Sequence, residues 1–368
     1  MKNYEVLINL GYHYAESIIS GTKRGVGVRN SYIFSSFIKH LATYSIRYKI
    51  LMLNKPRKMP LWLIPLATTK CCYSLEPLHM FLLSKSHSRI KANGSIIFIH
   101  YYFDLVLYNW DRDYLTIVEM PESIIETAGY LARRRYGVSL LRKELASYLR
   151  RAFAVTVPTM RDALSYIGLG INSNRIYVIY NVFPHPFTLE RVVNMTNRDR
   201  RLAVVIDNWG PFEERLRLAL KIVRRFPRIE RVHLTNAPYS STMFGGKIVA
   251  HEYMPRAKWL ELLSTTSIFL FYPKIKWSGG YSVRLNDAAL MGNVVFGGEY
   301  ELRGEPYPHT FTYLDENDLF VKLQCILDKE TLHEMGLRNH MEAIRRYRIG
   351  VAELERLISN VTKKILGS

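Results

Sequence analysis

The chain has 368 residues, 48% of them hydrophobic, and a formal net charge of +19. Single cores usually stop growing near ~250–300 residues, so this length favours two domains over one. Apolar runs such as Leu61–Ala67 are far shorter than the ~18–20 residues of a membrane-spanning helix, and the start shows no secretion-signal pattern. We therefore expect a soluble, cytoplasmic chain rather than a membrane-spanning or secreted one.

Positive charge is concentrated in the first half of the chain. Residues 1–185 hold 24 Lys and Arg against 11 Asp and Glu, whereas the remainder holds 27 against 21. Such an excess indicates an anionic partner: a phosphorylated substrate, an anionic membrane face or nucleic acid. The three cysteines, Cys71, Cys72 and Cys325, have no metal-binding spacing, so we assign no metal.

In the first half, short apolar strands alternate with helical stretches, which is the pattern of parallel βαβ units. A glycine-containing loop, Ser20–Asn30, joins the first strand to the first helix. Strands are predicted at about 4–10, 48–54, 94–100, 114–120, 154–158 and 175–183, and helices at about 31–45, 140–153 and 159–169.

The same pattern restarts after a stretch at 186–201 that is predicted to be a linker. Strands are predicted at about 202–207, 231–237, 247–254, 267–273 and 293–298, and helices at about 213–226, 256–264, 283–291, 316–328, 329–346 and 351–365. The sequence therefore predicts an α/β fold with two doubly wound domains, 1–185 and 202–350, and a C-terminal helix at 351–368.

The segment "SGGYSVRLNDAALMGNVVFGG" (Ser278–Gly298) follows a predicted buried strand and is the main candidate for a ligand site. Gly279 and Gly280 permit a tight turn, and Ser282 is a suitable N-cap for the helix that follows. The N–H groups at a helix start suit an anion, and the cations Arg284 and Lys276 would reinforce them.

Asp287 lies one turn after Arg284 on the same helical face, where a carboxylate could accept hydrogen bonds from sugar hydroxyls. Gly292 is placed to end this helix. The alternative is a helix with a glycine at its start, a glycine at its end and a solvated Asp287, because a Gly-Gly pair before a helix is a weak signal.

Two longer pieces give this segment a context: "RLNDAALMGNVV" (Arg284–Val295) and "AVTVPTMRDALSYIGLGINSNRIYVIYNVFPHP" (Ala154–Pro186). They resemble the corresponding parts of retaining GT-B glycosyltransferases of the family 4 type. The resemblance covers residues 154–346 and is looser over residues 1–110. It implies a GT-B architecture, in which two Rossmann-like domains face each other across a cleft and the C-terminal helix returns to the first domain.

The resemblance also implies roles for the matching positions. Asp287 falls where the family has the second glutamate of a Glu-x7-Glu pair, which there binds the nucleotide ribose. Gly279 replaces the first glutamate, as in a branch with Gly-Gly and a following basic residue. His100 falls where a histidine faces the sugar and the acceptor. The implied catalytic residues are thus His100 and Asp287, and the implied substrate-binding residues are Gly25, Gly27, Lys276, Gly279, Gly280, Tyr281, Ser282 and Arg284.

Two departures from the family pattern bear on activity. The family carries an Arg and a Lys on the donor diphosphate after the first strand of the second domain, whereas "DNWGPFEER" (Asp207–Arg215) has no Lys at that place. Lys274, Lys276, Arg284 or Arg215 could supply this charge. The missing lysine and the missing first glutamate leave an altered donor or an inactive member open.

Several candidates have ordinary structural alternatives. Gly25 and Gly27 could form a surface turn instead of a phosphate-binding loop, and His100 could be a core histidine. Glu119 and Glu122 could be acid or base groups, or plain carboxylates of a loop or helix start. An Arg-rich stretch at 133–151 is either a solvated face or a surface for anionic lipid.

The sequence thus predicts an enzyme that moves a sugar, with retention, from a nucleotide-diphosphate sugar to a sugar, lipid-linked or protein acceptor. A route in which the leaving phosphate deprotonates the acceptor requires no metal or other cofactor. Contact with the inner face of a membrane is a further hypothesis. The alternatives are a catalytically inactive GT-B-like binding protein and a basic nucleic-acid-binding protein, although no nucleic-acid-binding motif is present.

Overall fold

The computed structural model describes residues 5–10, 26–43, 47–52, 95–101, 115–120, 146–196, 200–207, 211–272, 283–297 and 306–367. These residues belong to two compact units. The first contains the strands that precede Tyr180, together with the chain from Val351 onward. The second contains the chain from Tyr180 to Gly350.

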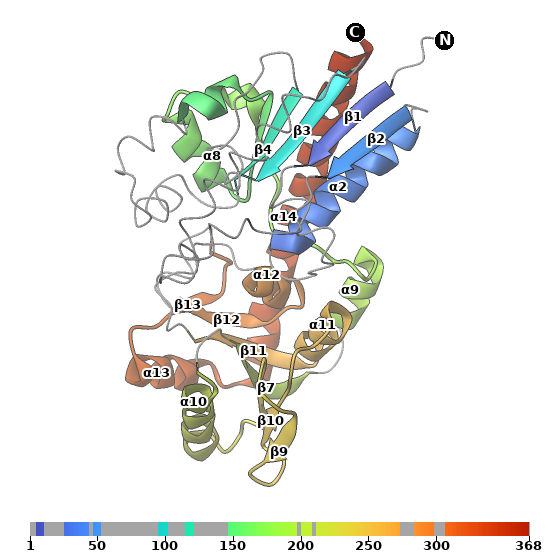
Figure 1. Ribbon diagram of the computed structural model, residues 1–368. Helices are drawn as coiled ribbons and strands as arrows, with labels where there is room; N and C mark the ends of the chain where they lie inside the picture. Colours follow the sequence, from blue (N-terminus) through green and yellow to red (C-terminus); the bar gives the residue numbers. More distant parts are fainter. Residues whose placement is uncertain are drawn as a thin grey trace, which may run out of the picture. The chain divides into compact units, whose positions relative to one another are not determined.

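The first unit is built on a six-stranded parallel sheet with the order β2-β1-β3-β4-β5-β6 (Figure 1). Its strands are β1 (Glu5–Leu10), β2 (Arg47–Met52), β3 (Ser95–Tyr101), β4 (Leu115–Glu119), β5 (Ala154–Val157) and β6 (Ile176–Val178). The order reverses between β1 and β3, and doubly wound sheets bind ligands at the carboxyl ends of the strands beside such a reversal.

Helices cover both faces of this sheet. Ile33, Phe37 and Leu41 recur at helical spacing along α2 (Val26–Thr43) and pack with Leu357 and Val361 of α14 (Lys329–Leu366) in the core. Two short helices follow β5, namely α8 (Met160–Ile167) and the 3₁₀ helix η3 (Ser173–Arg175). The C-terminal part of α14 therefore returns to the first unit, as the fold prediction expected.

The second unit has a seven-stranded sheet with the order β13-β12-β11-β7-β8-β10-β9. Its strands are β7 (Arg201–Asp207), β8 (Arg231–Leu234), β9 (Ser241–Met243), β10 (Ile248–Ala250), β11 (Thr266–Phe271), β12 (Val294–Gly297) and β13 (Thr310–Thr312). All pairings are parallel except that of β9 with β10. The order reverses around β7, so the carboxyl ends of β7 and β11 mark the place where a ligand would bind.

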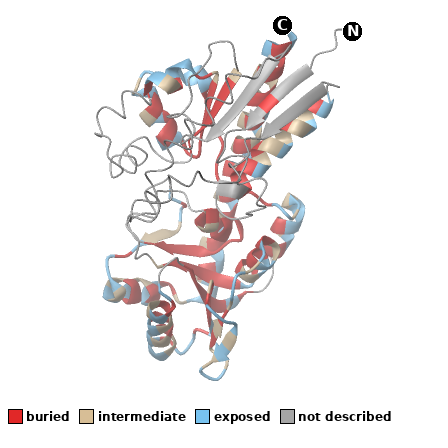
Figure 2. Ribbon diagram, viewed as in Figure 1, coloured by how far each residue is buried: buried red, intermediate tan, exposed pale blue. Residues whose placement is uncertain are grey.

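The central strands β7, β11 and β12 of the second sheet are almost entirely buried, whereas the edge strands β9 and β13 are not (Figure 2). One face packs against α10 (Phe212–Arg225) and α13 (Glu316–Ile326) in the main hydrophobic core. The other face carries α11 (Arg256–Ser264) and α12 (Val283–Leu290), with α9 (Leu189–Thr196) packed on α11 (Figure 1).

The structure differs from the predicted elements in several places, and the short strands β9 and β13 were not predicted. The predicted linker 186–201 contains the helix α9. The helices predicted at 329–346 and 351–365 form the single helix α14, because the glycine between them costs only about 1 kcal/mol in a helix with buried residues at intervals along its length. Helix α2 begins at Val26, so Gly27 lies in its first turn and not in a loop.

Candidate functional site

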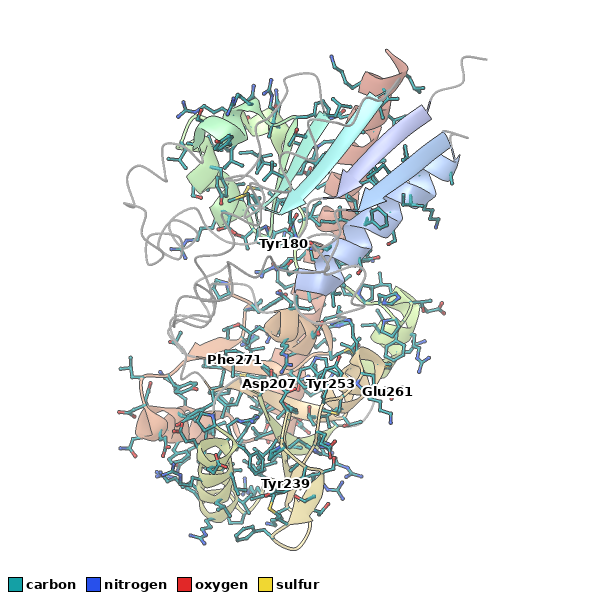
Figure 3. The ribbon with its side chains drawn as sticks, in the orientation of Figure 1. Tyr180, Asp207, Tyr239, Tyr253, Glu261 and Phe271 are labelled. Carbon is teal, nitrogen blue, oxygen red and sulfur yellow. The ribbon has the colours of Figure 1, made fainter. Side chains whose placement is uncertain are left out.

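The two strands at the reversal of the second sheet end at Asp207 and Phe271, which are paired in the sheet and labelled in Figure 3. Asp207 is 0% exposed. Its Oδ1 accepts hydrogen bonds from Thr235 Oγ1 and from Asn236 Nδ2 (3.2 Å), and it forms an ion pair with Arg284. Among the described residues, nothing hydrogen-bonds to its Oδ2. Asp207 therefore connects the end of β8 to the start of α12.

Arg215, in α10, holds the residues that directly follow β8. Its guanidinium donates to the backbone carbonyls of Thr235 and of Asn236, the second at 3.3 Å. Burial lowers the pKa of Arg215, and the charge of Asp207 opposes that effect. Arg215 was one of the cations considered as a substitute for the missing lysine at the diphosphate. Its guanidinium is instead hydrogen-bonded to the backbone that follows β8.

Asp287 lies in α12 and is 1% exposed. Arg256, in α11, donates to both of its carboxylate oxygens at 2.6 Å, and the Trp259 Nε1 donates to Oδ2 at 3.1 Å. Arg256 also donates to the backbone carbonyls of Phe183 and His185, each at 2.7 Å. This carboxylate therefore joins α12, α11 and the chain that precedes α9.

The ionisation of the Asp287 carboxyl depends both on its burial and on its partner Arg256. Burial raises the pKa of the Asp287 carboxyl, and the Arg256 guanidinium and the Trp259 N–H oppose that rise. A two-pronged arginine–carboxylate pair is the geometry in which a buried ion pair keeps both charges. A solvated Asp287, one of the two sequence interpretations, is wrong, since the residue is buried in its ion pair.

An open pocket, whose 470 Å³ of empty space includes open solvent, is lined by Asp287 and by Arg284, the ion-pair partner of Asp207. Its walls come from the loops that follow β8 and β10, from α11 and from the start of α12. They are formed by Thr235, Asn236, Glu252, Tyr253, Met254, Arg256, Trp259, Val283, Arg284 and Asp287.

The chemistry of this pocket is mixed. The Tyr253 side chain is well exposed, at 46% for the whole residue, and the Arg284 guanidinium lies 5.7 Å from the centroid of the Trp259 ring. Aromatic rings, amide and carboxylate groups and a cation in one concave site suit a ligand with a flat ring and an anionic part.

The position of α12 is fixed by its end. Gly292 has a φ of 73°, and the N–H groups of Gly292 and Asn293 donate back to Ala289 and Ala288 at 2.9 Å. The predicted role of Gly292 as the residue that ends the helix is therefore confirmed, since a positive φ favours glycine.

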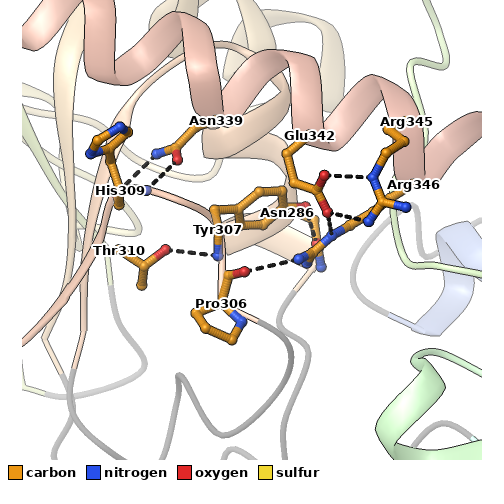
Figure 4. A network of polar contacts seen from close by, with 9 residues as sticks. All are labelled: Asn286, Pro306, Tyr307, His309, Thr310, Asn339, Glu342, Arg345 and Arg346. Carbon is orange, nitrogen blue, oxygen red and sulfur yellow. Dashed lines mark hydrogen bonds and ion pairs between the residues drawn. The ribbon is translucent and has the colours of Figure 1, made fainter.

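A polar network also holds α12 to α14 (Figure 4). The Tyr307 hydroxyl donates to Asn286 of α12 at 2.5 Å, and the Arg346 guanidinium lies 4.2 Å from the centroid of the Tyr307 ring. Arg346 in turn donates to Pro306 O at 2.9 Å and to Glu342 at 2.8 Å. The helix that carries Arg284 and Asp287 is thus anchored at several points.

Of the predicted site residues, the structure brings Arg284 and Asp287 to one pocket. His100 is in β3, near the carboxyl edge of the first sheet, and Gly27 is in α2. The side chain of His100 lies outside the described part of the structure. Six predicted residues also lie outside the described residues: Gly25, Lys276, Gly279, Gly280, Tyr281 and Ser282.

Sequence reasoning missed Arg256 and Trp259 and did not assign a role to Asp207. A carboxylate that ends an apolar strand beside the reversal of a sheet was a usable signal for Asp207. The sequence held no comparable signal for Arg256, because its partner Asp287 is 31 residues away.

Glu119, weighed as an acid or base, belongs to a closed pair in the first unit. It accepts from Arg29, at 3.3 Å for the longer bond, and from Thr156, and Arg29 also donates to Ile179 O. Neither sequence interpretation of Glu119 holds, because it is a buried ion-pair partner. Glu122 lies outside the described residues.

In the described part of the chain, no group of three or more His, Cys, Asp or Glu residues is placed to hold a metal ion. No helix within the same residues is long and apolar enough to cross a membrane.

No family model matches the sequence, and no curated protein matches it. The fold, in contrast, is similar to many solved structures. One is the UDP-GlcNAc 2-epimerase of Neisseria meningitidis bound to UDP-GlcNAc, with a TM-score of 0.53 and 12% identity over 96% of this chain and 100% of that one.

Two further similar structures are not described as epimerases. Anabaena HepE, in complex with UDP and glucose, has a TM-score of 0.52 and 12% identity over 97% of this chain and 99% of that one. A glycosyltransferase of kitacinnamycin has a TM-score of 0.51 and 9% identity over 96% and 98%. The predicted GT-B-type α/β fold is thereby confirmed, since the similarity spans nearly the whole chain.

Proposed function

We propose that the protein is a nucleotide-sugar enzyme whose second unit binds the nucleotide in the pocket between β8, β10, α11 and α12. The observation that carries this proposal is the combination of Tyr253, Trp259 and Arg284 in one pocket at the carboxyl edge of a doubly wound sheet. UDP or a UDP-sugar bound to proteins of the same fold supports the ligand class.

In this proposal the aromatic side of the pocket holds the nucleoside and Arg284 meets the diphosphate. A phosphate oxygen competes with Asp207 for the Arg284 guanidinium, whose side chain is 20% exposed. The sequence candidates Lys276, Gly279, Gly280, Tyr281 and Ser282 would extend this phosphate site at the start of α12.

Asp287 has a different role here from the one that the family resemblance implies. Its carboxylate is 1% exposed and already accepts from Arg256 and Trp259, so a ribose hydroxyl could reach it only if these side chains moved. We therefore treat Asp287 as a positioning residue that orients Arg256 and Trp259 at the pocket. His100, Gly25 and Gly27 stay candidates for the sugar, the acceptor and the diphosphate on the first unit.

The reaction proposed is transfer with retention. The bond between the anomeric carbon and the diphosphate oxygen breaks, and the acceptor hydroxyl bonds to that carbon from the same face. The hydroxyl proton passes to the departing phosphate oxygen, so that a nucleoside diphosphate and a glycoside result. Cationic groups at the diphosphate would stabilise the charge that grows on it as it leaves.

A second candidate is epimerisation of a nucleotide sugar, which the similarity to a UDP-GlcNAc 2-epimerase favours. An epimerase inverts one carbon of the sugar and consumes no acceptor. A third candidate is a binding protein without activity, since Arg284 and Asp287 are both paired within the protein.

One experiment separates these candidates. UDP-, GDP- and ADP-sugars are incubated with the protein and followed by NMR, in parallel with thermal unfolding in the presence of each nucleoside diphosphate. A ligand at 100 times its Kd should stabilise the protein by about 2.7 kcal/mol. Free nucleoside diphosphate indicates transfer or hydrolysis, whereas a new diastereomeric nucleotide sugar indicates an epimerase. Stabilisation without conversion indicates a binding protein or a transferase that requires its acceptor, and the absence of both effects would overturn the nucleotide-sugar assignment.

A further inference from the structure

A second groove lies in the first unit, away from the residues considered so far. It contains about 1100 Å³ of empty space. Its lining comes from the starts of β4 and β6, from the chain just before β5 and β6, and from the last turns of α14: Leu115, Arg151, Ala152, Phe153, Asn174, Arg175, Tyr177, Asn360, Lys363 and Lys364.

The groove lies at the amino edge of the first sheet. Leu115 is the first residue of β4, Phe153 precedes β5 and Arg175 precedes β6. These three strands are parallel neighbours, so their beginnings share one edge, where the end of α14 also lies (Figure 1). Doubly wound sheets bind their nucleotides at the opposite, carboxyl edge, so this groove is not part of a nucleotide site.

Its charge is strongly one-sided. Four of the described lining residues are Lys or Arg, and no described lining residue is Asp or Glu. The negative end of the α14 dipole accounts for Lys363 and Lys364 in its last turn. It does not account for Arg151 and Arg175, which reach the same groove from two other segments of the chain. Arg151, Arg175 and Lys364 thus bring like charges from three segments to one groove, which favours the binding of an anion there.

The polar groups of the groove are held in place. Arg175 donates to the backbone carbonyls of Arg150 at 3.1 Å and of Ala152 at 3.4 Å, and the Arg151 guanidinium lies 5.0 Å from the centroid of the Tyr148 ring. The Tyr177 hydroxyl accepts from Asn360 Nδ2 at 2.9 Å, so its own O–H can donate to a ligand.

We propose that this groove is a binding site for a ligand with clustered phosphate groups. Arg151 and Arg175 supply guanidinium groups that match phosphate oxygens, and Lys364 supplies a compact charge. Leu115 and Phe153 give the groove an apolar part beside its cations. The same chemistry occurs in a soluble polyphosphate and in the headgroups of an anionic lipid surface, and the test distinguishes the two sources. The proposal does not depend on nucleotide binding by the second unit.

The test compares two double variants that each remove two exposed cations. Arg151→Gln with Lys364→Gln alters the groove, and Arg217→Gln with Arg224→Gln alters α10 of the second unit as a matched control. Binding of tripolyphosphate is measured by calorimetry at low salt. Binding to vesicles is measured by cosedimentation with mixed phosphatidylcholine and phosphatidylglycerol vesicles and with vesicles of phosphatidylcholine alone.

We expect the wild type to bind tripolyphosphate or the anionic vesicles, and the groove variant to bind at least about tenfold more weakly. The control variant should bind as the wild type does. Binding to tripolyphosphate alone identifies a soluble ligand, and binding to anionic vesicles alone identifies a lipid headgroup. Equal losses in both variants, or no binding of either probe by the wild type, would overturn the proposal. The single variant Lys364→Gln repeats the comparison with less disturbance of the fold.

Discussion

Each sheet carries an arginine–carboxylate pair near its carboxyl edge, and the two pairs differ in what surrounds them. In the first unit the side chains of Arg29 and Glu119 are 1% and 2% exposed, and their further partners are Thr156 and the Ile179 carbonyl. In the second unit Arg284, paired with Asp207, borders an open pocket. The closed pair, Arg29 with Glu119, fixes α2 to the first sheet. In the open pair, Arg284 with Asp207, the arginine can exchange its protein partner for a ligand.

The largest expected effect is on the closed pair. Replacing Glu119 by Ala removes the carboxylate that balances the buried Arg29 charge, so the free energy of unfolding should fall by about 3–5 kcal/mol. Urea unfolding monitored by fluorescence measures this change.

The control is Arg191→Ala, which removes an exposed pair with Glu261 at 3.5 Å and should cost about 0–1 kcal/mol. If Glu119→Ala is as mild as Arg191→Ala, the closed pair is not structural in the way we describe.

This closed pair also shows where sequence reasoning reaches its limit. The strand that ends at Glu119 was predicted from its apolar run, but Arg29 lies 90 residues away in the chain. Local patterns determine strands and helices, and so the alternating βαβ order predicted the fold class. They carry no information on which distant charges meet.

The candidate site shows the same contrast between local features, which the sequence predicts, and contacts between distant residues, which it does not. Gly292 was predicted to end α12 because its backbone role is local, and the structure bears this out. Asp287 was selected from its helical spacing to Arg284 and from a family resemblance, but neither contained anything about Arg256 or Trp259, which donate to its carboxylate. The chain folds these partners together only through the packing of α11 on α12.

A second prediction concerns the pH dependence of stability and the hydrogen-bonded pair of histidines, His233 and His251. His233 and His251 are hydrogen-bonded at 2.9 Å, and burial lowers the pKa of His233 from 6.5 to about 3, with His251, Arg231 and Arg201 adding to the effect. As the pH falls, the His233 imidazole is protonated near pH 6.5 in the unfolded chain but only near pH 3 in the folded protein. The stability that the neutral imidazole contributes is therefore present above pH 6.5 and is lost as the pH falls towards 3.

Wild-type stability should therefore fall by about 2 kcal/mol between pH 6.5 and pH 5 from this group alone. Urea unfolding of the wild type and of His233→Gln at both pH values measures the difference. A His233→Gln protein with the same pH dependence as the wild type would contradict this account.

A smaller effect is expected at the open pair. Arg284→Lys keeps a positive charge for Asp207 but loses the fork of donors that suits a phosphate. We expect little change in stability and about tenfold weaker binding of a nucleoside diphosphate, which corresponds to about 1.4 kcal/mol. Calorimetric titration provides the measurement. Unchanged affinity together with a large loss of stability would make this pair structural, like the closed one.

The most direct test of the central claim is nucleoside diphosphate binding by two matched tyrosine variants. Tyr253 lines the pocket and is 46% exposed, whereas Tyr239 is 49% exposed and does not line it. If the pocket binds the nucleotide, Tyr253→Ala should weaken binding by about three- to tenfold, as expected for the loss of one aromatic contact, and Tyr239→Ala should not change it. Equal affinities of the wild type and both variants, or no binding by the wild type, would contradict the account.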